Sequence, residues 1–387
     1  MKRLPLEGVL VADFSRVLAG PLCTQLLADE GARVIKVEDP ARGDETRRWG
    51  PPFLGDVATY FLSVNRNKES LALDLRTEEG QAIARELIAR ADVVIDNFLP
   101  SQRAVLLDVP ADKIHCSITG FDGDTNEANT PGYDLLAQAA SGLMAITGTP
   151  DGEPAKIGVA LADVLTAHYA HGAILAALYA GGGRRIEVSL FSATLASLVN
   201  VAQGALATNA EAKRYGNAHP SIVPYQLFHA SDRPFAIGGG TDRHFRNLCE
   251  QVVERPELAE QFATNGERVT KRDVLVPVLE EIFATKPADE WVSRCRGAGI
   301  PASVVQGVLE ALRSEAARPL IVKVENYETV RHPVRFDGER LPIRTAPPRL
   351  GEHTEAIRRE LAVGEQEQRA ADREDEDQER GHQAKVR

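Results

Sequence analysis

The first half of the chain alternates between short apolar runs and segments in which apolar residues recur at helical spacing. The helical segments 21–31 and 77–91 each lie between two apolar runs, and Thr77 is a suitable N-cap for the second. Short strands that alternate with helices predict parallel βαβ units. We therefore expect an α/β fold whose large domain is an open, mostly parallel, Rossmann-like sheet with helices on both faces. The runs expected to form its strands are residues 8–14, 32–37, 71–75, 92–96 and 114–119.

The second half of the chain predicts a smaller α/β domain and two segments without regular pattern. Long helices are expected at 162–180 and 191–207, after which periodicity is lost. The last residues are almost entirely polar and charged, which is typical of a disordered acidic tail whose removal should change neither activity nor melting temperature. The expected division is a large domain that begins with 1–207, a crossover linker at 208–224, a small α/β domain at 225–312, a return segment to the large domain at 313–363 and the tail at 364–387.

Charge and cysteine usage narrow the class of protein. The formal net charge of −11 repels nucleic acid and anionic lipid, so neither is expected as a partner. No stretch approaches the ~18 apolar residues needed to cross a bilayer, so no membrane association is expected. The four cysteines lie far apart and form no CxxC pair, which argues against a metal site and indicates a reducing cytoplasm.

Ligands of a parallel sheet bind at the carboxyl ends of its strands. The first such loop, residues 15–21, has one glycine followed by a proline and lacks the GxGxxG pattern that holds a pyrophosphate. Glu38 ends the second expected strand, where a ribose-binding acid would lie, but without the glycines a nicotinamide or flavin site is not expected. The basic turn 65–68 is either a phosphate site or a solvated loop.

Asp163 is a second candidate for chemistry. It lies near the N-terminus of the helix 162–180, where the helix dipole favours an ionised carboxylate that could attack a thioester carbonyl. The commoner role of such an aspartate is a plain helix cap. His168 and His171 share a face of this helix, but no third ligand follows at a suitable spacing, so a structural role is expected. The residues alone therefore indicate an α/β enzyme with an anionic or acyl ligand.

Several long segments, taken in order, resemble the family III CoA-transferases, which include formyl-CoA transferase, carnitine CoA-transferase and α-methylacyl-CoA racemase. The resemblance extends from Leu4 to about Leu361. Within the family the chain is most similar to succinyl-CoA:glutarate (hydroxymethylglutarate) CoA-transferases, through WGPPF, SVNRNK and AKRYGNAHPSIVPYQLF. The family segments include LEGVLVADFSRVLAGPLCTQLLADEGARVIKVE, GDETRRWGPPF, CSITGF, PGYDLLAQAASGLMAITG and APPRLGEHT.

The resemblance implies that Asp163 is a covalent nucleophile. Its carboxylate attacks the acyl-CoA carbonyl to give an aspartyl anhydride, CoA thiolate then forms an aspartyl-CoA thioester, and an acceptor acid reverses these steps. The implied reaction moves CoA from a donor such as succinyl-CoA to a small carboxylic acid, with a dicarboxylate such as glutarate expected. CoA and acyl-CoA are then substrates, and no tightly bound cofactor is expected. The family architecture also implies an interlocked homodimer and a large domain that binds CoA.

Other site residues follow from the same resemblance. Small residues in the first loop are expected to supply backbone N–H groups that stabilise the tetrahedral intermediates. The guanidinium of Arg47 is expected to select a dicarboxylate acceptor through two hydrogen bonds, unless it only pairs with Asp44 or Glu45. The residues expected to line the substrate side are Arg16, Leu18, Ala19, Gly20, Arg47, Tyr133 and Asp134. The residues expected to bind CoA are Arg66, Asn67, Lys68, Asn97, Phe98 and Arg103.

The chain departs from the family pattern at two places that concern CoA. Asp39 stands where the family often has an arginine that helps to hold the adenosine diphosphate. The stretch after Pro100 is shorter than usual, and Arg103 lies near enough to compensate. The alternatives to transfer are an acyl-CoA racemase and a catalytically silent CoA-binding dimer. Racemisation requires a histidine where this chain has Tyr133, and a phenol is a poor general base at neutral pH.

Overall fold

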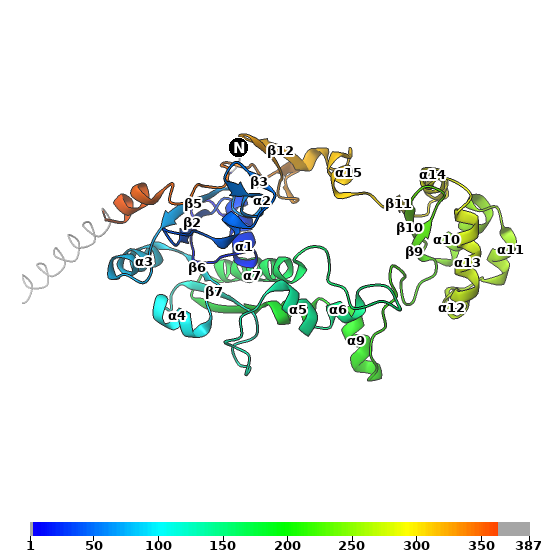
Figure 1. The fold of residues 1–387 in the computed structure, drawn as a ribbon, viewed down its shortest axis with the longest axis horizontal. Helices are drawn as coiled ribbons and strands as arrows, with labels where there is room; N and C mark the ends of the chain where they lie inside the picture. The colour runs from blue at the N-terminus through cyan, green and yellow to red at the C-terminus, as the bar shows by residue number, and fades with distance from the viewer. Residues whose placement is uncertain (1–2, 363–387) are drawn as a thin grey trace, which may run out of the picture. The chain divides into compact units, whose positions relative to one another are not determined.

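The computed structural model describes residues 3–362, so the predicted tail at 364–387 lies outside the described residues (Figure 1). The chain forms two compact units, which are considered separately. The first unit combines the described residues of 1–143, 157–203 and 319–387, and the second combines 144–156 and 204–318. The segment 144–156 thus belongs to the second unit, whereas the sequence pattern places it within the large domain.

The first unit is built on a six-stranded sheet with the order β5-β2-β1-β6-β7-β8, in which every pair of neighbours is parallel. The predicted mostly parallel α/β sheet is therefore confirmed. The order reverses between β1 and β6, so the loops that follow these two strands border the crevice where ligands of such sheets bind. The strands are β1 (Leu10–Asp13), β2 (Arg33–Glu38), β5 (Lys68–Ala72), β6 (Val93–Asp96), β7 (Ile114–Thr119) and β8 (Arg184–Ser189).

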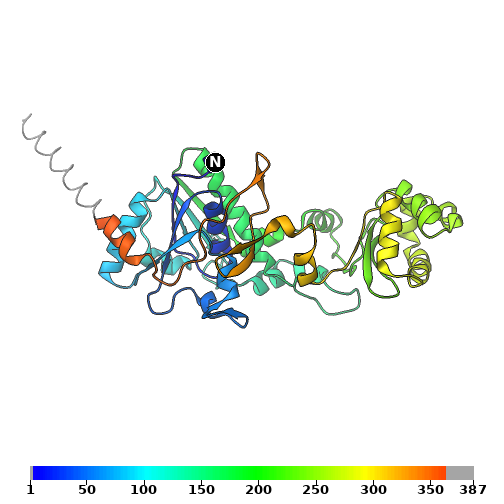
Figure 2. The ribbon, with the colours of Figure 1, turned by 90° about the horizontal axis from the view of Figure 1, so that it is seen from above.

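Helices cover both faces of this sheet. On one face α1 (Ala19–Asp29) packs against α7 (Leu161–Tyr179), and both contribute to a core with side chains of β1, β6 and β7 (Figure 2). On the other face α3 (Glu78–Arg90) and residues 354–362 enclose a second core. Thr77 caps α3 as predicted, because its hydroxyl accepts a hydrogen bond from the Gly80 N–H at 3.0 Å.

The remaining elements of the first unit are shorter. They are η1 (Glu45–Arg48), β3 (Phe53–Leu54), β4 (Val57–Ala58), α2 (Thr59–Ser63), α4 (Pro100–Leu106), α5 (Asp134–Ala140), α8 (Leu190–Ala196), β12 (Ile321–Val324), β13 (Tyr327–Val330), β14 (Arg335–Phe336) and β15 (Glu339–Arg340). Two helices, α6 (Leu143–Ile146) and α9 (Val199–Thr208), and the 3-10 helix η3 (Arg318–Leu320) lie where the chain passes from one unit to the other.

The outer edge of the sheet is covered by residues from the far end of the chain. The Ser70 N–H of β5 donates to Nδ1 of His353 at 3.2 Å, and the His353 N–H donates to the Ser70 carbonyl at 3.1 Å. The Ala72 N–H donates to the Thr354 hydroxyl at 2.9 Å. These contacts satisfy backbone groups of β5 that an uncovered edge strand would leave unpaired.

The second unit is a three-stranded antiparallel sheet, with the order β11-β10-β9, packed on helices. Its core includes Phe228, Phe235, Phe283 and Trp291, and the Phe283 ring lies 4.9 Å from that of Phe228. The elements are β9 (Tyr225–His229), β10 (Pro234–Gly238), β11 (Ala302–Val304), α10 (Asp242–Asn247), the π-helix η2 (Leu248–Val252), α11 (Pro256–Gln261), α12 (Asn265–Thr270), α13 (Arg272–Phe283), α14 (Ala288–Gly297) and α15 (Val308–Arg313).

Two sequence predictions about helices need correction. The single helix expected at 191–207 is two helices, α8 and α9, and the chain bends by 77° between them. Val199, the first residue of α9, has a φ of 40°. In addition, α7 is long and apolar enough to cross a membrane by length and composition, although no such stretch is expected from the sequence. The Ala-rich face of α7 lies in the first core, where Ala162, Ala167 and Ala170 are fully buried.

Candidate active site

The loop between β1 and α1 is held in an unusual conformation. Val17 has a φ of 73°, in the left-handed region that a β-branched residue rarely adopts. Gly20 is required because a Cβ at this position would lie 2.2 Å from the Cβ of Ser15. Leu18 occupies the N-cap of α1 and offers no side-chain acceptor, so the first N–H groups of the helix need partners from elsewhere.

Asp163 supplies one of these partners. The Ala19 N–H donates to Asp163 Oδ1 at 3.3 Å, which places the carboxylate at the positive end of α1. Asp163 itself lies in the first turn of α7 and is half-buried. Its carboxylate therefore faces the crevice at the carboxyl ends of β1 and β6, between the N-termini of two helices.

Asp134 performs the capping that the sequence suggested for Asp163. The Ala162 N–H donates to Asp134 Oδ1 at 2.8 Å, and Gln138 donates to the other oxygen at 2.8 Å. Burial first, and then the negative charge of Asp134, raises the pKa of Asp163 to about 7, although the Ala19 N–H partly opposes this. A carboxylate with a pKa near neutrality is typical of a functional group.

A pocket opens over Asp163. It brings together several residues predicted for the site: Arg16, Ala19, Asn97, Phe98, Tyr133 and Asp163. Asn97 fixes the loop below it, because its side chain accepts from the Arg16 N–H at 3.0 Å and donates to the Arg16 carbonyl at 2.8 Å. Tyr133 is half exposed at the rim. Three other predicted site residues do not line the pocket, although each is next in sequence to a residue that does: Leu18, Gly20 and Asp134.

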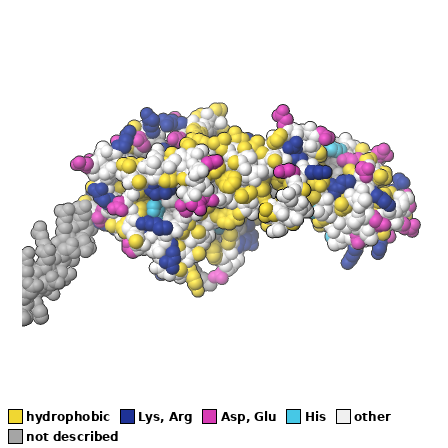
Figure 3. Space-filling model, turned by 90° about the horizontal axis from the view of Figure 1, so that it is seen from below, with side chains coloured by type: hydrophobic (Ala, Val, Ile, Leu, Met, Phe, Trp, Pro, Cys, Tyr) yellow, Lys and Arg dark blue, Asp and Glu magenta, His cyan; other side chains and the backbone are white. Residues whose placement is uncertain are grey.

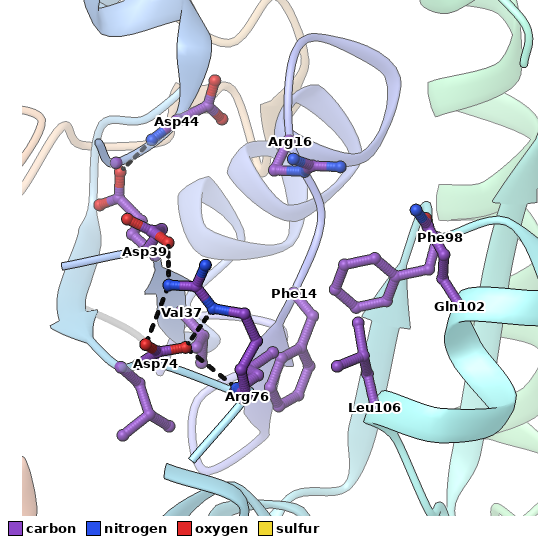
Figure 4. Close-up of a pocket in the computed structure, with 14 residues that line it drawn as sticks. Phe14, Arg16, Val37, Asp39, Asp44, Asp74, Arg76, Phe98, Gln102 and Leu106 are labelled. Atoms are coloured by element: carbon purple, nitrogen blue, oxygen red, sulfur yellow. Dashed lines mark hydrogen bonds and ion pairs between the residues drawn. The ribbon is translucent and has the colours of Figure 1, made fainter. Parts of the chain in front are cut away.

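A second pocket lies beside the first and shares Arg16, Phe98 and Gln102 with it. Phe14, Phe98 and Leu106 contribute apolar side chains to its lining, and Arg76 lies between two carboxylates (Figure 4). Arg76 pairs with Asp74 at 2.8 Å and with Asp39 at 3.6 Å, and the Arg76 side chain is 73% exposed. Asp39, which stands where an arginine is frequent, thus borders a pocket whose cations are Arg16 and Arg76.

The structure assigns Arg47 a role different from the predicted selection of the acceptor. Its guanidinium donates from Nε and NH2 to both oxygens of Glu38, at 2.8 and 2.7 Å. It also lies 3.7 Å from the ring centroid of Phe61 and is buried, and it lines neither pocket. The partner expected in the alternative, Asp44 or Glu45, is also wrong, because Glu38 takes both hydrogen bonds.

Three consecutive residues predicted to bind CoA are engaged inside the protein. Arg66 pairs with Asp29 at 2.6 Å and Asn67 donates to Asp29 at 2.7 Å. Lys68 is fully buried and pairs with Asp13 at 3.3 Å. The solvated-loop interpretation of residues 65–68 is therefore wrong, because these residues are buried. Both cations are paired inside the protein, so neither presents a free charge to a phosphate.

The Arg103 side chain also has internal partners. Its guanidinium donates from Nε to Asp96 Oδ1 at 2.9 Å and from NH2 to the Phe98 carbonyl at 3.1 Å. It supports the Phe98 loop from behind instead of replacing the arginine absent at Asp39.

His171, for which the sequence predicts a structural role, pairs with Glu30 at 3.0 Å. Within residues 3–362 no group of His, Cys, Asp and Glu could hold a metal ion.

The sequence interpretation missed three residues at or near the site: Tyr60, Gly120 and Gly132. Burial, and then the charges of Asp163, Asp134 and Asp44, raises the pKa of Tyr60 to about 12, so this phenol lies near the carboxylates. Gly120 and Gly132 also line the pocket, where a Cβ on Gly120 would lie 2.6 Å from the Gly132 Cα. Gly120 directly follows β7, so the rule that ligands bind at strand ends could have identified it.

The fold and this site define an α/β protein with one carboxylate, that of Asp163, lining a pocket at the crevice of a parallel sheet. Residues 6–354 match the model of CoA-transferase family III. The chain is 38% identical to succinyl-CoA:glutarate CoA-transferase of Homo sapiens, over 93% of this chain and 88% of that protein. It is also 38% identical to acetyl-CoA:oxalate CoA-transferase of Acetobacter aceti, over 93% and 97% of the two chains.

Solved structures agree with these matches. The crystal structure of a CAIB/BAIF family protein from Brucella suis superposes with a TM-score of 0.84 at 39% identity, covering 93% of this chain and all of the other. The chain belongs to CoA-transferase family III, and it is an enzyme that transfers CoA.

Proposed function

We propose that this enzyme transfers CoA from succinyl-CoA to a small dicarboxylic acid such as glutarate, with Asp163 as the covalent nucleophile. The observation that carries the mechanism is the Asp163 carboxylate, which lines the pocket and accepts the Ala19 N–H at 3.3 Å. The acids are proposed from relatives, which include succinyl-CoA:glutarate CoA-transferases of human and mouse. Arg47 is not available to bind the distal carboxylate of the acceptor, because Glu38 occupies it.

The steps exchange one acyl bond for another without a change of redox state. An Asp163 oxygen attacks the thioester carbonyl, the C–S bond breaks, and CoA leaves as a thiolate. The thiolate then attacks Cγ of Asp163, and the donor acid leaves with the bridging oxygen. The acceptor carboxylate attacks this aspartyl-CoA thioester, and the released thiolate attacks the acceptor carbonyl to free Asp163.

The Ala19 N–H stabilises the half of this sequence in which Asp163 itself is attacked. When the thiolate adds to Cγ, negative charge develops on the carboxyl oxygen that this N–H already contacts. The N-terminus of α1 adds the positive end of its dipole. CoA enters and leaves as a substrate, with its phosphates near Arg16 and Arg76 and its thioester directed from the second pocket towards Asp163.

Isotopic oxygen tests the covalent path. Because the acceptor carboxylate supplies the bridging oxygen of the second anhydride, transfer to glutarate labelled with ¹⁸O in both carboxylates should leave one ¹⁸O atom in Asp163. Mass spectrometry of the proteolytic peptide that contains Asp163 measures this. Label in the peptide supports the path, and turnover without any label in Asp163 contradicts it. A panel of mono- and dicarboxylic acids tests the acceptor class in the same assay.

The activity should depend on pH through Asp163. Only the ionised carboxylate can attack, and its pKa is about 7, so kcat/KM should rise with pH and reach half its maximum near pH 7. Initial rates between pH 5.5 and 8.5, with succinyl-CoA well below KM, provide the measurement. A rate that is independent of pH over this range would exclude Asp163 as the group whose ionisation limits the free enzyme.

We also propose a homodimer. Helix α7 has 19 residues and a mean hydropathy of 1.2, yet only 33% of its most apolar window is buried within one chain. Tyr179 is 96% and Val199 is 69% exposed, and hydrophobic side chains gather in a broad area on one face of the first unit (Figure 3). A second copy would cover such a surface. Sedimentation at micromolar concentration should therefore show a dimer, and an active monomer would contradict this prediction.

The cytoplasm is the proposed location. All four cysteines, at positions 23, 116, 249 and 295, are free and buried. Burial raises the pKa of the thiols of Cys249 and Cys295 to about 12, which keeps them protonated and unreactive. Free, unreactive thiols are typical of proteins in a reducing compartment.

A further inference from the structure

A fully buried ion pair lies behind the loop that contacts Asp163. Lys36 Nζ is 2.9 Å from Asp44 Oδ2, and both side chains are completely inaccessible to solvent. Asp44 also accepts from the Thr46 N–H at 3.0 Å and the Thr46 hydroxyl at 2.7 Å. Burial opposes ionisation of Asp44, but Lys36 and Thr46 outweigh it and lower the pKa of Asp44 to about 2.

Both members of the pair reach the loop. The Val17 N–H donates to the Asp44 carboxylate at 3.2 Å, and Lys36 donates to the Ser15 carbonyl at 2.8 Å. Val17 is the residue with a φ of 73°, a strained conformation for a non-glycine residue that persists only when neighbours enforce it. Two residues further on is Ala19, whose N–H contacts Asp163.

We propose that the buried Asp44–Lys36 pair is a positioning device for the nucleophile: it holds Val17 in its left-handed conformation and thereby directs the Ala19 N–H at Asp163. Asp44 borders the second pocket, but its side chain is fully enclosed and its carboxylate is held by Lys36, Thr46 and Val17, so it does not touch the reacting atoms. It acts through the backbone of the loop. The inference rests on the proposed role of Asp163 and extends it to residues that the mechanism itself does not use.

The pair has a matched control elsewhere in the first unit. Asp29 and Arg66 are 2.6 Å apart, with side chains 2% and 5% exposed, and their hydrogen bonds do not reach the loop at 15–19. Asp44→Asn and Asp29→Asn therefore each remove one charge from a buried pair. Only Asp44→Asn should disturb the loop.

The test compares these variants in the full-length enzyme with succinyl-CoA and glutarate. For Asp44→Asn we expect kcat to fall at least tenfold while KM for succinyl-CoA changes less than threefold. The pH of half-maximal kcat/KM should also move upwards, because the Ala19 N–H favours the ionised form of Asp163. The other charged group acting on Asp163, Asp134, is unchanged in this variant. Asp29→Asn should shift neither kcat nor the pH midpoint, even where it lowers the melting temperature.

A rescue experiment separates positioning from general stability. Glycine adopts a positive φ without strain, so adding Val17→Gly to Asp44→Asn should restore kcat by several-fold. If Asp44→Asn does not fold, Val17→Pro removes both the N–H and the positive φ without altering the buried pair, and the same loss of kcat and pH shift is expected. Equal effects of Asp44→Asn and Asp29→Asn, or an unchanged pH midpoint, would overturn the proposal. An enzyme that shows no transfer between these acids would instead count against the proposed substrates.

Discussion

Asp163→Asn should lower kcat for CoA transfer by about a thousandfold or more. The amide oxygen can still accept the Ala19 N–H, so the geometry of the loop is kept, but an amide is not a nucleophile towards a thioester. Thioester exchange between succinyl-CoA and glutarate, followed by mass spectrometry, measures the loss. The exposed Asp124 provides a control, since Asp124→Asn should leave the rate unchanged. Retention of more than a few per cent of wild-type turnover would remove Asp163 from the mechanism.

The same substitution should stabilise the folded protein at alkaline pH. The folded pKa of Asp163 is about 7 against an ordinary value of 3.8, so its contribution to stability is fully present below pH 3.8 and is lost as pH rises through 7. Asparagine carries no charge to bury. At pH 8 the variant should gain on the order of 4 kcal/mol at most, and the gain should vanish towards pH 4. Thermal melts at these two pH values measure it, and a variant that melts lower than wild type at pH 8 would contradict the assignment.

Arg47→Met should destabilise the first unit by about 3–5 kcal/mol, because it leaves the buried carboxylate of Glu38 without its main partner. Glu38 is completely enclosed, and after the substitution only neutral donors such as Ser70 and the more distant charge of Lys36 would remain. Chemical denaturation followed by circular dichroism gives the free energy of unfolding. The adjacent Arg48 is exposed, so Arg48→Met is the matched control and should change the stability little.

Two further measurements distinguish this structural role from the selection of an acceptor. Adding Glu38→Gln to Arg47→Met removes the uncompensated charge and should recover part of the lost stability. Below the unfolding transition, Arg47→Met should affect glutarate and a monocarboxylate of similar length equally. A selective loss with glutarate alone would restore Arg47 to the acceptor site.

The sequence predicts the parallel sheet well because each βαβ unit is encoded locally. The strand β7 and the cap at Thr77 lie where the pattern places them. Asp163 is different, since helix position alone could not separate a nucleophile from a cap. The distinction depends on Asp134, which is distant in sequence and takes over the capping. Only the family resemblance made Asp163 a candidate nucleophile in advance.

The sequence does not predict which cationic side chains form buried ion pairs. Residues such as Arg47, Arg66 and Lys68 stand in polar segments that suggest contact with solvent or phosphate. Their partners, among them Glu38 and Asp29, are brought to them by the packing of β2, β5 and α1, and no spacing along the chain reveals this. The Asp44 contact with Val17 is likewise a tertiary one, so the strain in that loop is invisible in the sequence.

The contacts of His353 and Thr354 with β5 determine when this edge of the sheet is covered during synthesis of the chain. Ser70 and His353 are 283 residues apart. At ribosomal rates of about 5–20 residues per second, the edge of β5 waits roughly 15 to 60 seconds for its cover. Throughout that time the nascent first unit exposes an unpaired strand edge. It also exposes the apolar surface that Ile357 and Leu361 later cover. The first unit is therefore completed only after residues 353–361 have been synthesised, and until then the growing chain needs protection from association with its neighbours.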